Sequence, residues 1–198
     1  EPEKPKEEVV DLTPRAYHRT PEMHLREGSL VTDWGRHNIG YLKDITPYGA
    51  TFQPLDLKGY QKEKALQYVL LRDAYERLYR YESNLHEANV QWREHLNTCY
   101  DEFVMRYGNL NAKQNVKLVM MDAGGRDILS LERVKNGKFV KADIFERPVS
   151  FAVESHANVG SPEEALSASL NKFGTVDLDY MREITDSTAE ELLTALQG

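Results

Sequence analysis

Four cationic side chains around one short turn give this chain its clearest capacity for chemistry, which is binding to phosphate. They flank Asn136 and Gly137, whose small side chains accept the positive φ of a two-residue hairpin turn, and they are Arg133, Lys135, Lys138 and Lys141. Such side chains on a two-stranded ribbon can follow a nucleic-acid backbone. Lysines at a hairpin tip also discourage pairing with other strands, so a purely structural role stays open.

No other set of residues has the spacing of a catalytic or cofactor-binding centre. The six histidines are scattered, and none lies in the HExxH pattern of a metal site. The segment 122–127, DAGGRD, lacks the GK[ST] sequence that holds nucleotide phosphates, so we interpret it as a turn that uses the backbone freedom of Gly124 and Gly125. No nucleophile, base and orienting group occur together. We therefore predict no enzyme activity, cofactor or metal for this chain.

Five further residues could be reactive or bind a base, but each has a structural interpretation that we favour. Cys99 lies among apolar neighbours and is predicted to be an inert core residue. Trp34 and Tyr48 could stack on a base, yet we expect them to be buried under helices. Asp101 and Glu102 are predicted to be exposed or capping charges of a helix.

The hairpin needs a larger scaffold, and the sequence predicts a sheet and helices. Short β-prone runs between glycines and prolines predict an antiparallel meander, with strands at 29–32, 39–43 and 50–52. Apolar residues recur every three or four positions over 60–107, which predicts amphipathic helix. A single helix of that length is too long for a compact domain. We expect two antiparallel helices, with a break near Ser83 and Asn84 and a C-cap at Gly108.

The two-residue turn also fixes the register of the hairpin, in which the facing pairs are Lys135 and Lys138, Val134 and Phe139, and Glu132 and Lys141. One face of the ribbon is expected to be apolar, from Leu129, Leu131, Val140, Ala142 and Ile144. Glu132 and Lys141 are expected to attract each other on the opposite face. A short helix over 112–122 should precede the hairpin.

The two ends of the chain differ in character from its centre. Residues 1–26 contain four prolines and mixed charges, which predicts an extended linker pinned only in places, by Val9, Val10, Leu12 and Tyr17. Ser161 and Glu164 form a capping box, and three short helices with a helix-turn-helix look are expected over 161–196. The last of them carries Glu190 and Glu191 where base-reading residues would be needed, so we predict that it packs or docks instead.

Composition limits the function classes. The chain has 198 residues, 40% of them hydrophobic, which is enough for a core, and no run is long enough to span a bilayer. We expect a cytoplasmic location. The net charge is −7. Proteins that bind duplex DNA alone usually carry a clear basic face, so DNA contact by this chain should be weak.

Five stretches of the chain resemble one segment of a known family. The likeness covers most of the chain, approximately 15–196, and its most specific parts are LTPRAYHRTPEMHLREGSLV, IGYLKD with YGATFQPLDL, LNTCYDEFVMRYGNLN, KFVKADIFERPV and SPEEALSASLNKFGTVDLDYM. The family is that of the very large DNA methyltransferase and helicase fusion proteins carried on bacterial mobile elements. In these proteins the segment follows an adenine-specific DNA methyltransferase domain and precedes a superfamily-two helicase domain.

The resemblance implies that DNA modification and remodelling belong to the neighbouring domains. The methyltransferase NPPY motif and the helicase Walker lysine are missing, so no catalytic residue of the family carries over to this sequence. S-adenosylmethionine, ATP and Mg are expected only in the parent protein. The chain opens on Glu1 with a linker-like stretch, so we expect it to be a piece of a longer protein.

These patterns together predict an α+β fold in three parts. Residues 1–26 form an extended linker, 27–150 an α+β core of meander, long helical pair and hairpin, and 151–198 a linker and a tri-helical unit that looks like a helix-turn-helix. The expected function is a non-catalytic scaffold between flanking methyltransferase and helicase domains, with weak DNA contact through the four hairpin cations. The alternative is an acidic module that binds a protein partner without DNA contact.

Overall fold

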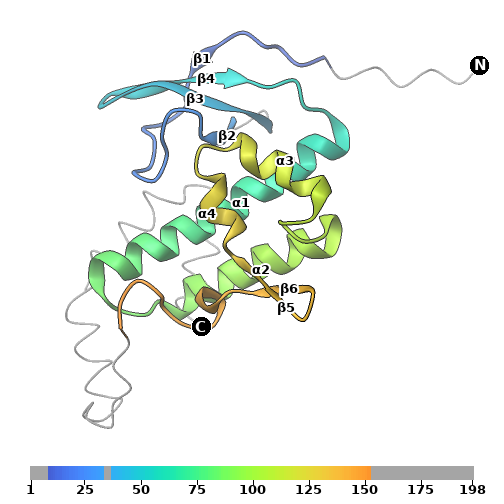
Figure 1. Ribbon diagram of the computed structural model, residues 1–198. Helices are drawn as coiled ribbons and strands as arrows, with labels where there is room; N and C mark the ends of the chain where they lie inside the picture. Colours follow the sequence, from blue (N-terminus) through green and yellow to red (C-terminus); the bar gives the residue numbers. More distant parts are fainter. Residues whose placement is uncertain (1–8, 34–36, 153–198) are drawn as a thin grey trace, which may run out of the picture.

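The computed structural model of the chain describes residues 9–33 and 37–152. In this part of the chain, four strands form one antiparallel sheet, two more form a hairpin, and four α-helices lie between them (Figure 1). The described residues are therefore α+β, as predicted. The predicted tri-helical unit and its capping box at Ser161 lie outside the described residues, and the boundaries at 26 and 150 stay predictions.

The sheet confirms the predicted meander and adds one short strand to it. Its strands are β1 (Arg15–Ala16), β2 (Leu30–Asp33), β3 (Asn38–Thr46) and β4 (Gly49–Pro54), in the spatial order β1-β4-β3-β2. Tyr48 lies in the turn between β3 and β4 and is 95% exposed, so the prediction that helices bury it was wrong. Trp34 lies outside the described residues.

Each face of the sheet packs against a different partner. Leu30 and Ile39 belong to the main core, which the helices complete. Val31, Leu42 and Phe52 form a second cluster, against which Tyr17 and Leu25 of the N-terminal segment pack; the prediction of Tyr17 as an anchor is confirmed. Among the other predicted anchors, Val10 is half-buried, but Val9 and Leu12 are 87% and 47% exposed, so those two were wrong. An apolar side chain near the end of the chain needs a facing surface, and those two have little.

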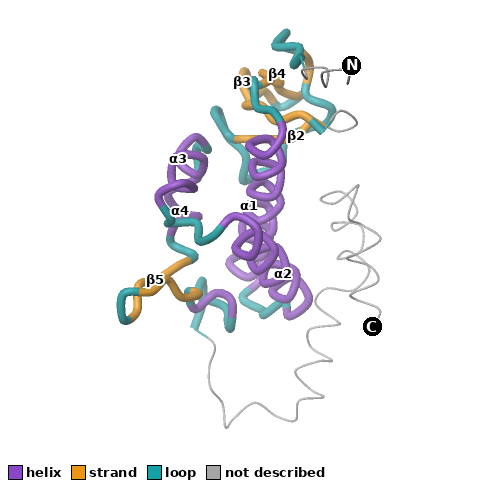
Figure 2. Tube along the Cα trace, turned by 90° about the vertical axis from the view of Figure 1, so that its right-hand side faces the viewer, coloured by secondary structure: helices purple, strands orange, loops and turns teal. Residues whose placement is uncertain are grey.

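Two long helices carry most of the core. Helix α1 (Gly59–Leu85) and helix α2 (Val90–Tyr107) pack on each other along their length (Figures 1 and 2). The chain reverses at His86, which adopts a left-handed φ of 52°, and Asn89 caps α2 by accepting a hydrogen bond from the backbone N–H of Trp92. Two helices and the C-cap at Gly108 were predicted correctly.

The helix pair is covered on one side by shorter elements that lead to the hairpin. Helix α3 (Lys113–Met121) confirms the predicted short helix, but helix α4 (Gly125–Leu129) was not predicted. Neither Gly124 nor Gly125 has a positive φ, so backbone freedom was the wrong reason for these glycines. A Cβ on Gly125 would lie 1.8 Å from the carbonyl oxygen of Val119, and glycine is required because two helices meet there.

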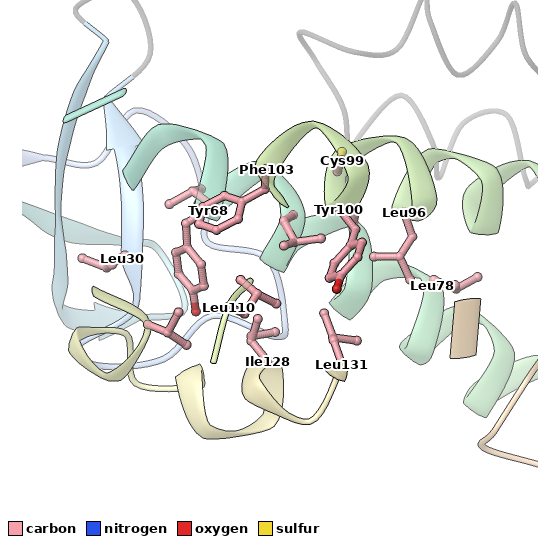
Figure 3. Packing of buried hydrophobic residues seen from close by; sticks show 14 of the residues in the cluster. Leu30, Tyr68, Leu78, Leu96, Cys99, Tyr100, Phe103, Leu110, Ile128 and Leu131 are labelled. Carbon is pink, nitrogen blue, oxygen red and sulfur yellow. The ribbon is translucent and has the colours of Figure 1, made fainter. Parts of the chain in front are cut away.

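The main core lies between α1, α2 and the segment 110–131. Tyr68, Phe103, Leu110, Ile128 and Leu131 all belong to this core (Figure 3). All five side chains are nearly or fully buried. Cys99 is also buried, at 7% exposure, which confirms its predicted place in the core.

A buried ionic network joins the sheet to the helices. The carboxylate of Asp122, in the α3–α4 turn, accepts hydrogen bonds from the Tyr68 hydroxyl at 2.6 Å, from Arg72 Nη1 at 2.9 Å and from the Leu30 backbone N–H at 2.9 Å. Arg72 Nη2 donates in turn to the Leu30 carbonyl at 2.6 Å. Burial, together with the Asp122 charge, raises the pKa of Tyr68, so the hydroxyl stays a donor. One carboxylate thus connects three elements that are distant in the sequence.

Candidate nucleic-acid interface

The predicted hairpin is present, and its register is the predicted one. Strands β5 (Glu132–Lys135) and β6 (Lys138–Lys141) pair antiparallel, with Lys135 facing Lys138 and Val134 facing Phe139. Asn136 and Gly137 have φ values of 53° and 74°, the left-handed region that a two-residue turn of type I′ requires. The hairpin projects beyond the helices, at the opposite end of the molecule from the four-stranded sheet (Figures 1 and 2).

Glu132 anchors the base of the hairpin inside the protein. Its side chain is 7% exposed. The carboxylate accepts hydrogen bonds from the Tyr100 hydroxyl at 2.7 Å, from Asn109 Nδ2 at 2.8 Å, from the Leu110 N–H at 3.1 Å, and from the N–H and Nδ2 of Asn111 at 2.8 and 3.0 Å. Burial alone would raise the pKa of Glu132, but the hydrogen bonds from Tyr100 and the two asparagines outweigh it and lower the pKa.

These bonds correct the predicted attraction between Glu132 and Lys141. The two residues are cross-strand neighbours, as expected, but the Glu132 carboxylate turns into the protein. Lys141 Nζ instead donates to Asn97 Oδ1 at 2.7 Å and lies 2.9 Å from Asp101 Oδ1 on α2. The face that carries Glu132 is therefore the one that attaches the ribbon to the helices. Asp101 and Glu102 are exposed, as predicted.

The four predicted cations lie on one hairpin but differ in what they can still bind. Arg133 is 2.8 Å from Asp143 Oδ1, and Lys141 is held by the α2 contacts, so carboxylates already offset both charges. Lys135 and Lys138 are exposed at the tip, and neither forms an ion pair with any residue that the structure describes. The tip pair is thus the part of the predicted set that is available to phosphate.

An exposed apolar pair next to the tip was missed from the sequence. Val134 is 69% exposed and Phe139 is 39% exposed, and because they face each other across the ribbon they lie on the same face. In the predicted apolar set, Leu131 and Ile144 are buried and the other three are only half-buried. The sequence did contain a signal for this pair: Phe139, an aromatic residue directly after Lys138, was not part of the predicted apolar face.

The surface is hollowed at the DAGGRD segment. A groove of about 770 Å³ is bounded there by residues that include Arg26, Lys43, Met120, Gly124, Arg126 and Asp127. The Asp122 carboxylate at its edge is already bonded to buried partners, and Arg26 Nη2 donates to the Ala123 carbonyl at 2.9 Å. Its charges are mixed, with cations beside Asp127. No group of three histidine, cysteine or acidic residues suited to a metal ion occurs in the part of the chain that is described.

Comparison with known proteins gives one match. Residues 158–198, which lie outside the described part, match a family model described as the winged helix domain of a probable helicase. The match covers less than half of the chain, and it supports a helicase-associated segment. No curated protein and no solved structure matches the chain. Among the described helices, none is long and apolar enough to cross a membrane.

Proposed function

We propose that this chain is a non-catalytic, helicase-associated segment that contacts DNA through the tip of the β5–β6 hairpin. The match of residues 158–198 to a winged helix domain of a probable helicase supports the association. The observation that carries the DNA contact is the hairpin itself, since it holds Lys135 and Lys138 without carboxylate partners in the described structure, on a ribbon that projects from the body.

The hairpin is anchored at its base, which favours a role in DNA binding over that of a solvated tip alone. Glu132 and Lys141 fix the base of the ribbon from both strands, through bonds to the 109–111 segment and to α2. Fixing the ribbon before binding lowers the entropy lost when a ligand is bound. Between Glu132 and Arg147 the sequence has five cationic and three acidic residues, so this part is locally positive although the chain carries −7.

The wider role that we propose is spatial. By its resemblance, the segment connects an adenine-specific methyltransferase domain to a helicase domain and holds them in a fixed relation, and S-adenosylmethionine, ATP and Mg would act in those neighbours. The buried networks around Asp122 and Glu132 join separate elements of the described part, which supports this role. Reading the complete gene tests it: NPPY upstream and helicase motifs downstream are expected, and their absence removes the fusion.

Salt-dependent binding tests the DNA contact. Affinity of the 198-residue chain for a fluorescent DNA duplex is measured by anisotropy between about 50 and about 200 mM salt. The double change Lys135→Glu and Lys138→Glu should weaken binding and reduce the slope of log affinity against log salt by about 2, one for each phosphate contact.

The matched control makes the same charge change elsewhere. Lys43 in β3 and Lys58 before α1 are exposed residues, the second of them 3.6 Å from Asp56 Oδ1, and changing both to glutamate should leave the salt slope within about 0.5 of that of the wild type. An equal loss in both double variants would show a nonspecific effect of net charge. No binding of the wild type to DNA would overturn the proposal and favour the acidic protein-binding module.

A further inference from the structure

The apolar face of the hairpin tip cannot bind phosphate, so the exposure of its two side chains must have another cause. Val134 and Phe139 lie next to the lysine pair, on a ribbon whose distal part is exposed on both faces. A two-stranded ribbon that only discouraged pairing would need charges there and no aromatic ring. Phe139 lies on the same face of the ribbon as Glu132 and Lys141, nearer the tip, and at 39% exposure part of its side chain is open to a ligand.

The two lysines and the phenylalanine around the turn are arranged in a way that suits binding of single-stranded nucleic acid. Residue pairs alternate between the two faces of a ribbon, so Lys135 and Lys138 lie on one face and Val134 and Phe139 on the other. A strand that crosses the tip can therefore place a phosphate near the lysines and a base near the ring. Proteins that bind single strands combine such cations with aromatic stacking platforms.

The overall charge favours an unpaired base over an intact duplex. Two available lysines on a chain of net charge −7 supply little of the phosphate neutralisation that dominates duplex binding. Stacking adds about 1 to 3 kcal/mol per base, a gain that does not depend on a basic surface. A base inside a duplex is stacked on its neighbours and is not available to Phe139.

We propose that Phe139 stacks on an unpaired base of single-stranded DNA while Lys135 and Lys138 hold the adjoining phosphates. Val134, the cross-strand neighbour of Phe139, adds apolar surface beside the ring. The inference rests on the proposed DNA contact of the hairpin and adds the form of DNA that is recognised. Because the segment is associated with a helicase, the expected ligand is a DNA strand that has been separated from its complement.

The first test compares variants of Phe139 on two forms of the same DNA. Affinities of the 198-residue chain are measured for a short single-stranded oligonucleotide and for its duplex. The wild type should prefer the single strand. Phe139→Ala should weaken single-strand binding about tenfold, as expected for loss of one stacked base, and should change duplex binding less than about twofold. Phe139→Tyr, which keeps the ring face, should restore single-strand binding, whereas Phe139→Leu should not.

Tyr48 provides the matched control for an exposed aromatic residue. It lies at the tip of the β3–β4 hairpin, at the other end of the molecule, and Tyr48→Ala should leave both affinities unchanged. A 2-aminopurine base in the single strand reports stacking directly, because its fluorescence should fall on binding to the wild type and not to Phe139→Ala. Melting curves confirm that each variant is folded.

The outcomes separate this inference from the proposed function. If the lysine double variant loses affinity for both DNA forms but Phe139→Ala loses none, the phosphate contact stands and the stacking is refuted. Equal losses for single strand and duplex in Phe139→Ala would also refute stacking on an unpaired base. If Phe139→Ala loses single-strand affinity and the lysine variant does not, the stacking stands and the proposed role of the lysines fails.

Discussion

Replacing Glu132 by glutamine should destabilise the protein far more than the small change in shape suggests. The carboxylate accepts five hydrogen bonds, two of them on Oε1 and three on Oε2. A glutamine side chain has an NH₂ group at one of these positions, where it faces donors. At the Oε1 position the N–H and Nδ2 of Asn111 would lose their acceptor, and the bonds to the other oxygen would lose the assistance of the charge.

The size of the effect follows from the number of bonds that are lost. Hydrogen bonds to a charged group contribute about 1.5 to 3 kcal/mol each, so the loss of two lowers the free energy of unfolding by about 3 to 6 kcal/mol. For a chain of this size that corresponds to a melting temperature lower by about 10 °C. Calorimetry measures this change, and hydrogen exchange at the Leu110 and Asn111 amides should become faster.

Glu94→Gln is the control, because Glu94 is an exposed residue of α2 and undergoes the same chemical change. It should alter the free energy of unfolding by less than about 0.5 kcal/mol. A Glu132→Gln protein within about 1 kcal/mol of the wild type would refute the view that this carboxylate anchors the hairpin. Unchanged exchange at Leu110 and Asn111 would refute it as well.

Three further changes test other parts of the fold. Acid should destabilise the wild type more than Glu132→Gln as the pH falls below about 4.5. The pKa of Glu132 is lowered from 4.5 in the folded state, so the stabilisation by its carboxylate is present above that value and is lost at lower pH; equal acid-denaturation curves would contradict this. Arg93→Met should lower the free energy of unfolding by about 3 to 5 kcal/mol because Glu82 would stay buried without its cation, and Glu82→Met in the same chain should recover much of the loss in urea titrations. Gly125→Ala should cost about 1 to 3 kcal/mol by thermal melting, since its Cβ would meet a carbonyl of α3, whereas Gly124→Ala should be tolerated because its nearest contact is a flexible side chain at 3.4 Å.

The sequence predicted the helical pair, the meander and the hairpin register because each has a strong local signal. The three-and-four spacing of apolar residues over 60–107 is a property of the helix alone, and the Asn136–Gly137 turn sets which residues face each other. The break between the helices came within a few residues of Ser83. These features need no knowledge of distant parts of the chain.

What the sequence could not predict depends on contacts between distant segments. Alternation in β5 and β6 tells which residues share a face, but the choice of the inward face is made by Tyr100, Asn109 and Asn111, which satisfy Glu132. Helix α4 is too short for a periodic pattern, and the need for glycine at 125 arises from packing against α3. Contacts between distant segments also explain why only two of the four cations stay available. Arg133 and Lys141 pair with Asp143 and Asp101, which come from other elements.

The N-terminal segment is fastened to α1 by polar contacts as well as by the apolar packing on the sheet. Arg77 pairs with Glu22 at 2.6 Å, His24 Nε2 lies 2.9 Å from Asp73 Oδ1, and Arg80 donates to the Met23 carbonyl at 3.0 Å. These contacts hold residues 17–25, called the strap below, against the face of the sheet that carries Val31, Leu42 and Phe52.

The strap determines where the chain can be shortened or cleaved. A fragment that starts at residue 27 would lose Glu22 and His24 and leave Arg77 and Asp73 as partly buried charges without those partners. It would also uncover Val31 and Phe52, an apolar surface suited to self-association. Within residues 9–33, proteases should therefore cut more readily before Arg15 than after it, and deletions that extend past that residue should yield aggregation-prone, poorly soluble protein.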